Sequence, residues 1–542
     1  MKRLAMLVLV SALGAVGVYG QPAGNATKCA DLARLALPHT AITKAEPIEA
    51  GKLQPPAAGP DAPADAPPDP IYSKLPAMCR VTAEAHPSAD SAIPIEVWLP
   101  VEGWNGRFLG VGNGGFAGSI GYHRLAVNVM RGYATAGTDT GHQASGIDAA
   151  WALGHPEKIA DFGWRAIHEM TLTGEALTQA FYGRAAAHRY FASCSDGGRE
   201  ALMEAQRFPA DYDGILAGAP AYQWTHLVSG GLFAMQALEG KRESYIPDTK
   251  LPAISRAVLA QCGKRGQAFL DDPRQCHFDP SVLLCHGAES HRCLTSAQMT
   301  ALKALYAGAH EKDGARIEYG QMPGAELGDG GWKTWITGSA PRKSAIWGFV
   351  TGYFDNMVYG EASLNVLTLD ADAAFDKAVE RTSHDLDATD PDLSELASRG
   401  GKLILYHGWN DPAIPALGTL DYYNSVAAKA GETGAAAFVR LFMISGLQHC
   451  AGGPGASDFG QGGPSEDPAL NDPQQNIYRA LENWVENGTA PEIVVARHAE
   501  EQTGKEKIKF SRPICAYPKA PVHSGSGDKF AAASYVCATS NK

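Results

Sequence analysis

The segment Arg189–Ala205 constrains the fold more than any other part of the chain, because it passes from an aromatic strand through small residues into a helix. Its turn reads Cys-Ser-Asp-Gly-Gly and places Ser195 at the sharpest point. A serine held this way exposes its hydroxyl above a sheet edge, and the strained turn accepts only small neighbours. Ser193 replaces the first glycine of the usual pattern, and Gly197 keeps the second. The segment predicts a nucleophile elbow, although an ordinary glycine-rich connection would read similarly.

Short apolar runs alternate with helical patterns on both sides of this segment. We expect buried strands at Ile93–Trp98, Arg107–Val111, Tyr133–Gly137, Arg189–Ser193, Gly214–Ala217, Lys402–Tyr406 and Phe438–Ile444. Short strands separated by helices are typical of a doubly wound, mostly parallel sheet. Together with the elbow, the pattern predicts the α/β class, with an α/β-hydrolase doubly wound sheet.

The middle of the chain interrupts this alternation. Residues 222–398 are rich in turn signals and hold four cysteines and a series of aromatic residues, after which the sheet pattern resumes. We therefore predict a hydrolase domain in two parts, residues 21–221 and 399–542, around a large inserted lid domain, residues 222–398. The Pro/Ala-rich stretch Gln54–Pro70 is expected to be an extended surface excursion.

An acid and a base can be assigned from the order of the chain. A serine hydroxyl needs a base that a carboxylate orients, and in this fold class the order is serine, acid, histidine. Asp411 and His449 each follow a buried strand, so both should meet Ser195 at one sheet edge. By itself Asp411 also fits a turn before proline, and a lone loop histidine is more often solvated. His407 is a competing base, but it shares a loop with Asp411.

Two cysteines favour the catalytic interpretation. Cys194 directly precedes Ser195, and Cys450 directly follows His449. If the two form a disulfide, their Cα atoms lie within ~7 Å, and the base must neighbour the nucleophile. The chain has ten cysteines, an even number, and none forms a Cys-x-x-Cys pair, which gives zinc or haem attachment little support.

The first twenty residues read as a secretory signal. Lys2 and Arg3 precede a mostly apolar stretch, and we expect cleavage after Gly20. No later stretch approaches the ~20 uninterrupted apolar residues of a membrane helix, so we expect a secreted or periplasmic protein without membrane contact. The net charge, 46 − 58 = −12, and the lack of Lys/Arg clusters argue against a nucleic-acid partner. No oligomeric state is predicted.

The sequence resembles the tannase and feruloyl esterase family, including mono(2-hydroxyethyl) terephthalate hydrolase. The likeness rests on the Cys-Ser and His-Cys arrangement, together with motifs that span nearly all of the mature chain. These begin at Gly112, Pro323, His407 and Trp484, and a cysteine-containing tail runs from Arg512 to Cys537. The resemblance implies an ester hydrolase acting on aromatic acid esters, with the insertion holding the acyl group.

The resemblance also implies how the cysteines pair and how the oxyanion is held. The implied disulfides are Cys29 with Cys79, Cys194 with Cys450, Cys262 with Cys276, Cys285 with Cys293, and Cys515 with Cys537. The amide of Asp196, first in the helix after Ser195, is one oxyanion donor expected from helix geometry. The turn of Gly114 and Gly115 would supply the second, because glycine lets the backbone approach a substrate.

The aromatic residues of the insertion suit a planar acyl group, since stacked rings contribute ~0.5 to 1.5 kcal/mol beyond area burial. The candidate contacts are Trp332, Trp335, Trp347, Phe349, Phe354 and, outside the insertion, Ile414. Packing inside the insertion is an equal alternative for each aromatic residue. Gallate, hydroxycinnamate and terephthalate monoesters all remain candidate substrates. A serine peptidase and a non-catalytic aromatic- or carbohydrate-binding protein are the alternatives from other classes.

One motif departs from the family. Members usually carry an aspartate-rich calcium loop after the first cysteine of the insertion, whereas this chain places Lys264 and Arg265 after Cys262 and keeps only Asp271 and Asp272. Calcium needs six to eight oxygen ligands, mostly carboxylates and carbonyls. We therefore predict no structural calcium, no other metal and no cofactor.

Overall fold

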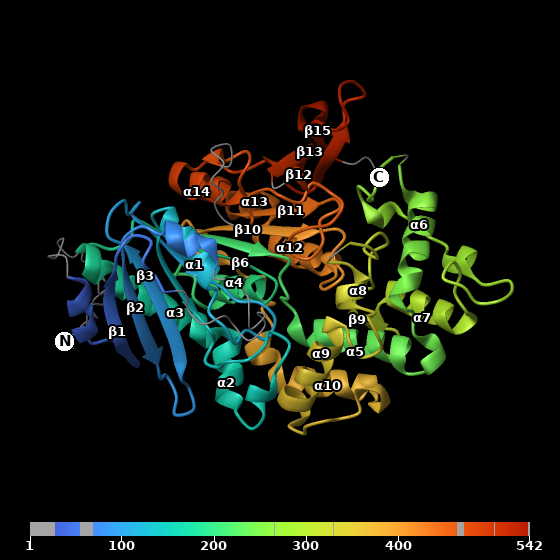
Figure 1. Cartoon of the computed structure of the whole chain (residues 1–542), viewed down its shortest axis with the longest axis horizontal. Coiled ribbons are helices and arrows are strands. Elements are labelled where there is room, and N and C mark those ends of the chain that lie inside the picture. The colour runs from blue at the N-terminus through green and yellow to red at the C-terminus, as the bar shows by residue number, and fades with distance from the viewer. Residues whose placement is uncertain are drawn as a thin grey trace, which may run out of the picture.

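A nine-stranded sheet forms the centre of the molecule (Figure 1). The computed structural model describes residues 28–54, 69–264, 266–328, 330–462, 471–502 and 505–539, so the predicted signal and most of the Pro/Ala-rich stretch lie outside the described residues. The strand order is β1-β2-β3-β5-β4-β6-β7-β10-β11. The strands are β1 Thr40–Ile48, β2 Met78–Ala85, β3 Ile93–Pro100, β4 Arg107–Val111, β5 Ala134–Thr138, β6 His188–Cys194, β7 Gly214–Gly218, β10 Lys402–Gly408 and β11 Val439–Ile444.

Six neighbouring strands, from β5 to β11 in the sheet order, run parallel to one another. The strands β1, β2 and β3 add an antiparallel meander to the β5 edge. The predicted α/β class is thus confirmed, and the seven predicted strands all occur with ends shifted by at most two residues. The pair β1 and β2 was not predicted.

Helices cover both faces of the sheet. Alternate residues of each strand point to opposite faces, and both sets of side chains are packed against helices. On β6, Phe191 joins the core with helices α3 Ala166–Tyr182, α4 Asp196–Arg207 and α12 Ala416–Ala430. Its neighbours Tyr190 and Ala192 join the core beneath α1 Tyr122–Met130 and α14 Ile477–Asn487. The sheet is therefore doubly wound, and the carboxyl ends of its parallel strands share one edge.

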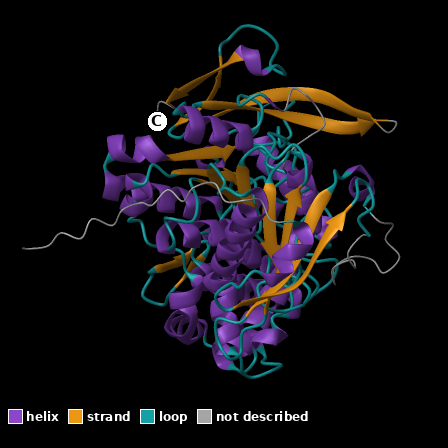
Figure 2. Ribbon diagram, turned by 90° about the vertical axis from the view of Figure 1, so that its left-hand side faces the viewer, coloured by secondary structure: helices purple, strands orange, loops and turns teal. Residues whose placement is uncertain are grey.

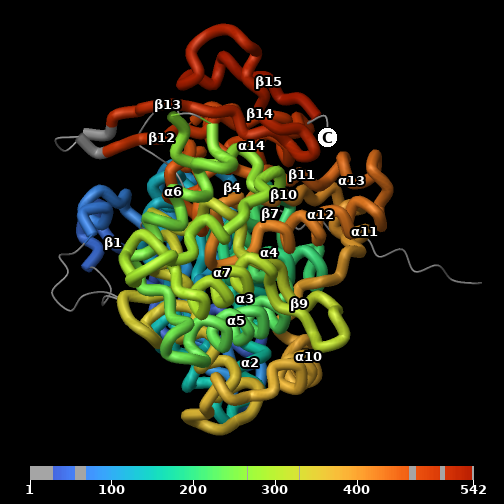
Figure 3. The backbone as a smooth tube through the Cα atoms, turned by 90° about the vertical axis from the view of Figure 1, so that its right-hand side faces the viewer, coloured from blue at the N-terminus to red at the C-terminus, as the bar shows by residue number. Residues whose placement is uncertain are grey.

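The chain leaves the sheet after β7 and returns at β10, and the insertion between them is mostly helical (Figure 3). Most of its helices pack around an apolar core of their own, to which Phe116, Phe162 and Ile414 also contribute. The helices are α5 Trp224–Glu239, α6 Leu251–Cys262, α7 Ser296–Ala307, α8 Trp332–Trp335, α9 Ala345–Gly352, α10 Ala371–Leu386 and α11 Ser394–Ser398, with short strands β8 Ala309–His310 and β9 Arg316–Glu318. The isolated bridge between Gln223 and Asp387 joins its two ends.

Two antiparallel hairpins end the chain and lie along one side of the molecule (Figure 2). They are β12 Ile493–Gln502 with β13 Lys505–Cys515, and β14 Lys519–His523 with β15 Tyr535–Thr539. The remaining helices are α2 Pro156–Ala160 and α13 Glu432–Phe438. Within the described residues, no helix is long and apolar enough to cross a membrane.

Candidate active site

Ser195 occupies the turn between β6 and α4 with φ 71° and ψ −125°. A positive φ is costly for a residue with a side chain and persists only where the surroundings impose it. The crowding shows at Gly197, where a Cβ would overlap the Ser193 side chain and the carbonyl oxygen of Asn113. The turn therefore has the strained backbone that the sequence predicts for an elbow. A larger residue at Gly197 would clash with its neighbours.

The three side chains expected to act together form one hydrogen-bonded series. The Nε2 atom of His449 lies 2.8 Å from the Ser195 hydroxyl, and its Nδ1 atom lies 2.8 Å from Oδ2 of Asp411. Asp411 follows β10 and His449 follows β11, so two adjacent parallel strands deliver acid and base to the elbow. This geometry allows a proton to pass from serine to imidazole while the carboxylate fixes the ring.

The Asp411 carboxylate is buried, yet it is held in its ionised form. Its Oδ1 atom accepts hydrogen bonds from the amides of Ala413 (2.8 Å) and Ile414 (3.0 Å). Burial acts to raise the pKa of Asp411, but the charge of His449 and the hydrogen bonds from His407 and His449 outweigh it. The pKa of Asp411 therefore lies well below its ordinary value.

A disulfide ties the loops of base and nucleophile together. Cys194 and Cys450 are bonded, with Cα atoms 6.0 Å apart and a separation of 256 positions along the chain. The remaining cysteines form the other four pairs that the resemblance implies, so the chain has no free cysteine. The bridge beside Ser195 fixes the separation of the reacting groups before a substrate binds.

Two backbone amides are candidate oxyanion donors. Asp196 begins α4, where an amide has no partner inside the helix. Gly115 lines the same pocket as Asp196, whereas Gly114 is not among the lining residues. Gly115 has φ 61°, and a Cβ there would overlap the carbonyl of Gly146. Of the two expected glycines, Gly115 is the better placed.

Buried charged groups of α4 support both donors. Oε2 of Glu200 accepts a hydrogen bond from the Asn113 amide at 2.8 Å and so anchors the start of the glycine turn. Burial and the charge of Asp196 raise the pKa of Glu200 to about 8. Arg199 bonds Asp196 at 2.7 Å and donates to the carbonyls of Phe162 and Gly163. These contacts fix the N-terminus of α4, and hence the amide of Asp196.

An apolar pocket of about 470 Å³ opens onto Ser195 and His449. Its other lining residues are Gly115, Asp196, Ala221, Trp224, Leu227, Val228, Trp335, Ile346, Phe349, Ala413 and Ile414. The ring of Trp335 meets that of His449 edge to face at 4.8 Å and stacks with Phe349 at 6.4 Å. The insertion thus supplies the aromatic side chains of the wall.

Only some of the residues predicted to contact the substrate line this pocket. Phe349 and Ile414 do, as does Trp335, but Trp332, Trp347 and Phe354 do not. Trp332 and Phe354 are fully buried in the core of the insertion, and Trp347 packs beneath Arg342. Packing, the alternative raised from the sequence, is what the structure shows for these three residues.

Sequence reasoning missed the wall that α5 contributes, namely Trp224, Leu227 and Val228. Trp224 comes six residues after the end of β7, at the sheet edge that holds Ser195. That position in the sequence could have predicted that Trp224 lies beside the pocket. Ile346 had no comparable signal, because its place depends on how α9 packs against α5.

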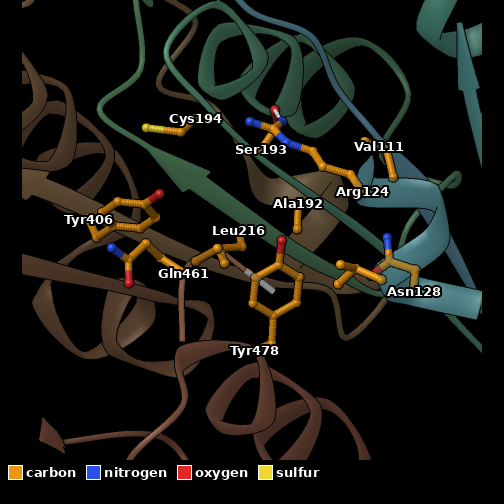
Figure 4. Close-up of a pocket in the computed structure, with 12 residues that line it drawn as sticks. Val111, Arg124, Asn128, Ala192, Ser193, Cys194, Leu216, Tyr406, Gln461 and Tyr478 are labelled. Carbon is orange, nitrogen blue, oxygen red and sulfur yellow. Dashed lines mark hydrogen bonds between the residues drawn. The ribbon is translucent and has the colours of Figure 1, made fainter. Parts of the chain in front are cut away.

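A second cavity, of about 450 Å³, lies beside β6 and shares no lining residue with the pocket at Ser195. Figure 4 shows Arg124 close to Ser193, to whose hydroxyl it donates a hydrogen bond of 3.0 Å. Tyr406 and Tyr478 line the same space. Ser195, Asp411 and His449 do not line this cavity, and the hydrogen bond from Arg124 holds a side chain of the elbow strand.

Three of the four residues expected to replace a calcium loop form ion pairs, and the fourth, Arg265, lies outside the described residues. Lys264 pairs with Asp271 at 2.6 Å, and Asp272 pairs with Arg274 at 2.7 Å. Among the described residues, His168, Glu204 and Asp211 form the group whose spacing could hold a metal ion. His168 and Asp211 already contact each other at 2.7 Å, while burial and Asp211 raise the pKa of Glu204. Burial therefore favours the neutral form of Glu204, in which a carboxyl group binds a metal ion poorly.

Comparisons with known proteins identify the family of the chain. The model of the family "Tannase and feruloyl esterase" matches residues 79–538. An uncharacterized esterase of Xanthomonas campestris pv. campestris is 40% identical, covering 98% of this chain and 95% of its own length. Feruloyl esterase B of Aspergillus niger is 33% identical, covering 85% and 86%.

Solved structures lead to the same family. The crystal structure of feruloyl esterase B from Aspergillus oryzae superposes with a TM-score of 0.83 at 29% identity, covering 93% of this chain and 98% of that one. An esterase from the same species gives a TM-score of 0.84 at 27% identity, with 94% and 99% covered. The chain therefore belongs to the tannase and feruloyl esterase family of carboxylic ester hydrolases.

Proposed function

We propose that this chain is a secreted serine esterase that hydrolyses esters of aromatic carboxylic acids through an acyl-enzyme. The observation that carries the proposal is the series Ser195, His449 and Asp411, joined by two 2.8 Å contacts beneath an aromatic-walled pocket. The family and the feruloyl esterases among the relatives support the aromatic acyl group.

The first half of the reaction forms the acyl-enzyme. Oγ of Ser195 attacks the ester carbonyl while Nε2 of His449 takes its proton, and the carbonyl oxygen becomes an oxyanion held by the amides of Asp196 and Gly115. The tetrahedral intermediate then collapses. His449 gives its proton to the departing alcohol, and Ser195 keeps the acyl group as an ester.

The second half releases the acid. His449 removes a proton from water, the resulting hydroxide attacks the acyl carbonyl, and the oxyanion again rests on the two amides. When the intermediate collapses, Ser195 leaves with the proton from His449. Asp411 stays ionised throughout, as its lowered pKa allows, and stabilises the imidazolium at both stages.

The pocket favours a flat, uncharged acyl group. Trp224, Trp335 and Phe349 can stack on a ring, and the lining residues include no Lys or Arg within the described part of the chain. A free carboxylate on the ring would lose its hydration there without an ionic partner. We therefore place hydroxycinnamoyl esters ahead of terephthalate monoesters, with galloyl esters between them because their hydroxyls need hydrogen bonds.

Export is part of the proposal. All ten cysteines are paired, which suits an oxidising compartment. A mature protein that begins at Gln21, isolated from outside the cytoplasm, is the expected product. An intact mass that retains residues 1–20 in active protein would contradict it.

Substrate profiling tests the activity. Wild type should hydrolyse a chromogenic aryl ester and should prefer methyl ferulate to methyl gallate and to mono(2-hydroxyethyl) terephthalate, while Ser195→Ala should fold normally without turnover. Retained turnover in Ser195→Ala would overturn the serine mechanism. Cleavage of peptides but not esters would favour a peptidase, and absence of any turnover in wild type would favour a binding protein.

A further inference from the structure

A second histidine contacts the acid of the triad. His407 is the penultimate residue of β10, and its side chain is fully buried. Its Nε2 atom lies 3.1 Å from Oδ2 of Asp411 and 3.1 Å from the carbonyl oxygen of Ile414. Its Nδ1 atom lies 2.7 Å from the hydroxyl of Thr419 on α12. The reaction proposed above gives this imidazole no role.

The contacts define which ring nitrogen of His407 carries a proton. Both neighbours of Nε2 are oxygens that can only accept, so Nε2 must donate. The hydroxyl of Thr419 can donate to Nδ1, which matches a neutral ring with its proton on Nε2. With the opposite tautomer, a lone pair would face a carboxylate and a carbonyl.

Two imidazoles therefore share one oxygen of Asp411. His449 approaches Oδ2 at 2.8 Å and His407 approaches the same atom at 3.1 Å, while Oδ1 is occupied by backbone amides. A carboxylate bonded on both oxygens cannot rotate about its bond to Cβ. His407 thereby restrains the position of the atom that orients the base.

We propose that His407 is a positioning residue, which holds Oδ2 of Asp411 toward His449 and withdraws part of its negative charge. The inference rests on the proposed function, because it assigns His449 as the base. Thr419 contacts Nδ1 of His407, and Asp411 and the carbonyl oxygen of Ile414 contact Nε2. Since both ring nitrogens are engaged, His407 is not a second base for Ser195.

The sign of its effect on the pH profile follows from the charge. A donor to Asp411 lowers the negative charge that His449 experiences, so removing it makes His449 a stronger base. Activity needs neutral His449, and the acidic limb of kcat/KM should therefore move to higher pH. In the described part of the chain, the titratable groups acting on Asp411 are His449 and His407, and Tyr406 is a group on which Asp411 acts in turn.

Two polar substitutions separate positioning from packing. The amide nitrogen of Gln reaches the place of imidazole Nε2, whereas that of Asn reaches only the place of Nδ1. His407→Asn should move the acidic limb of the kcat/KM profile by about half a pH unit or more to higher pH and lower kcat about tenfold. His407→Gln should keep the limb near that of wild type.

His168→Leu is the matched control, since it removes an imidazole–carboxylate contact of 2.7 Å, made through Nδ1 of His168, away from the site. It should leave the acidic limb unchanged. His407→Leu adds a variant without any donor and should shift the limb as His407→Asn does. Thermal unfolding of each variant accounts for losses of folded protein.

The outcomes distinguish this inference from the proposed function. If Ser195→Ala is inactive but the Asn and Gln variants share the wild-type limb, the positioning role of His407 is wrong and the serine mechanism stands. If the Asn and Gln variants shift the limb equally, the role is again wrong. If Ser195→Ala keeps its turnover, the proposed function itself fails.

Discussion

Removing the disulfide beside the elbow should reduce both stability and turnover. The bridge between Cys194 and Cys450 closes a loop of 256 residues. The loop-closure entropy of the unfolded chain then corresponds to about 5.5 kcal/mol at 25 °C. The smaller disulfide loops inside it, of 14 and 8 residues, change the logarithm little. Since whole domains are stable by only about 5 to 15 kcal/mol, the double variant to alanine should be marginal.

Turnover should fall for a separate reason. Without the bridge, the loop of His449 loses its covalent link to the strand of Ser195, and a misplacement of about 1 Å can cost about 100-fold in rate. Urea unfolding and kcat on a chromogenic aryl ester, measured where the variant is still folded, separate the two effects. The expected result is a loss of several kcal/mol together with a kcat at least tenfold lower.

A second disulfide gives the matched control. Cys285 and Cys293 lie in the insertion and close a loop of 8 residues, for which the same relation gives about 2.5 kcal/mol. Their double variant to alanine should lose about this much stability and keep its kcat. Equal losses of kcat in the two double variants, or an unchanged kcat without the Cys194–Cys450 bridge, would refute the proposed role of that bridge.

Three further predictions concern the pocket, the elbow helix and the calcium loop. Trp335→Ala should raise KM for aryl-acyl esters about tenfold but change KM for an acetyl ester little. The reason is that stacking on an aromatic acyl group contributes ~0.5 to 1.5 kcal/mol beyond area burial. Equal changes in KM for both esters would argue against stacking. The pKa of Glu200 is about 8 in the folded protein and that of an ordinary glutamate in the unfolded chain. At pH values between the two, the folded state binds more protons, so wild type should lose stability as pH rises from 5 to 8. Glu200→Gln should lose about 3 kcal/mol less in urea unfolding over that range, and an identical decline in both proteins would contradict the assignment. Dialysis against EDTA should leave the melting temperature unchanged. One calcium ion per chain by elemental analysis would contradict the prediction that the loop after Cys262 binds no calcium.

The parallel strands and the triad were the most predictable parts of the molecule. Strands such as β7 and β10 are buried on both faces, so they read as largely apolar runs in the sequence. The residues that follow such strands must meet at one edge of the sheet. That rule brings Ser195, Asp411 and His449 together without any knowledge of side-chain packing.

The antiparallel edges were harder to predict. Strand β1 includes Lys44 and Glu46, has no fully buried residue and lies at the edge of the sheet, so it lacks an apolar run. The terminal hairpin β12 and β13 stands outside the main sheet and carries many charged residues. Pairing of such strands depends on their partners more than on their own composition.

The walls of the pocket depend on how helices of the insertion pack. Trp332 and Phe349 both belong to an aromatic series, yet one is buried in the core of the insertion and the other faces Ser195. Composition does not separate the two. The position of α5 does, because it brings Trp224 to the sheet edge and sets α9 against it.

Covalent labelling with a fluorophosphonate, followed by peptide mapping, measures the identity of the nucleophile directly. One adduct per chain should appear on Ser195, disappear in Ser195→Ala, and form much more slowly in His449→Ala. An adduct on any other residue, or full hydrolysis by protein whose Ser195 is completely labelled, would contradict the assignment of this serine as the reacting group.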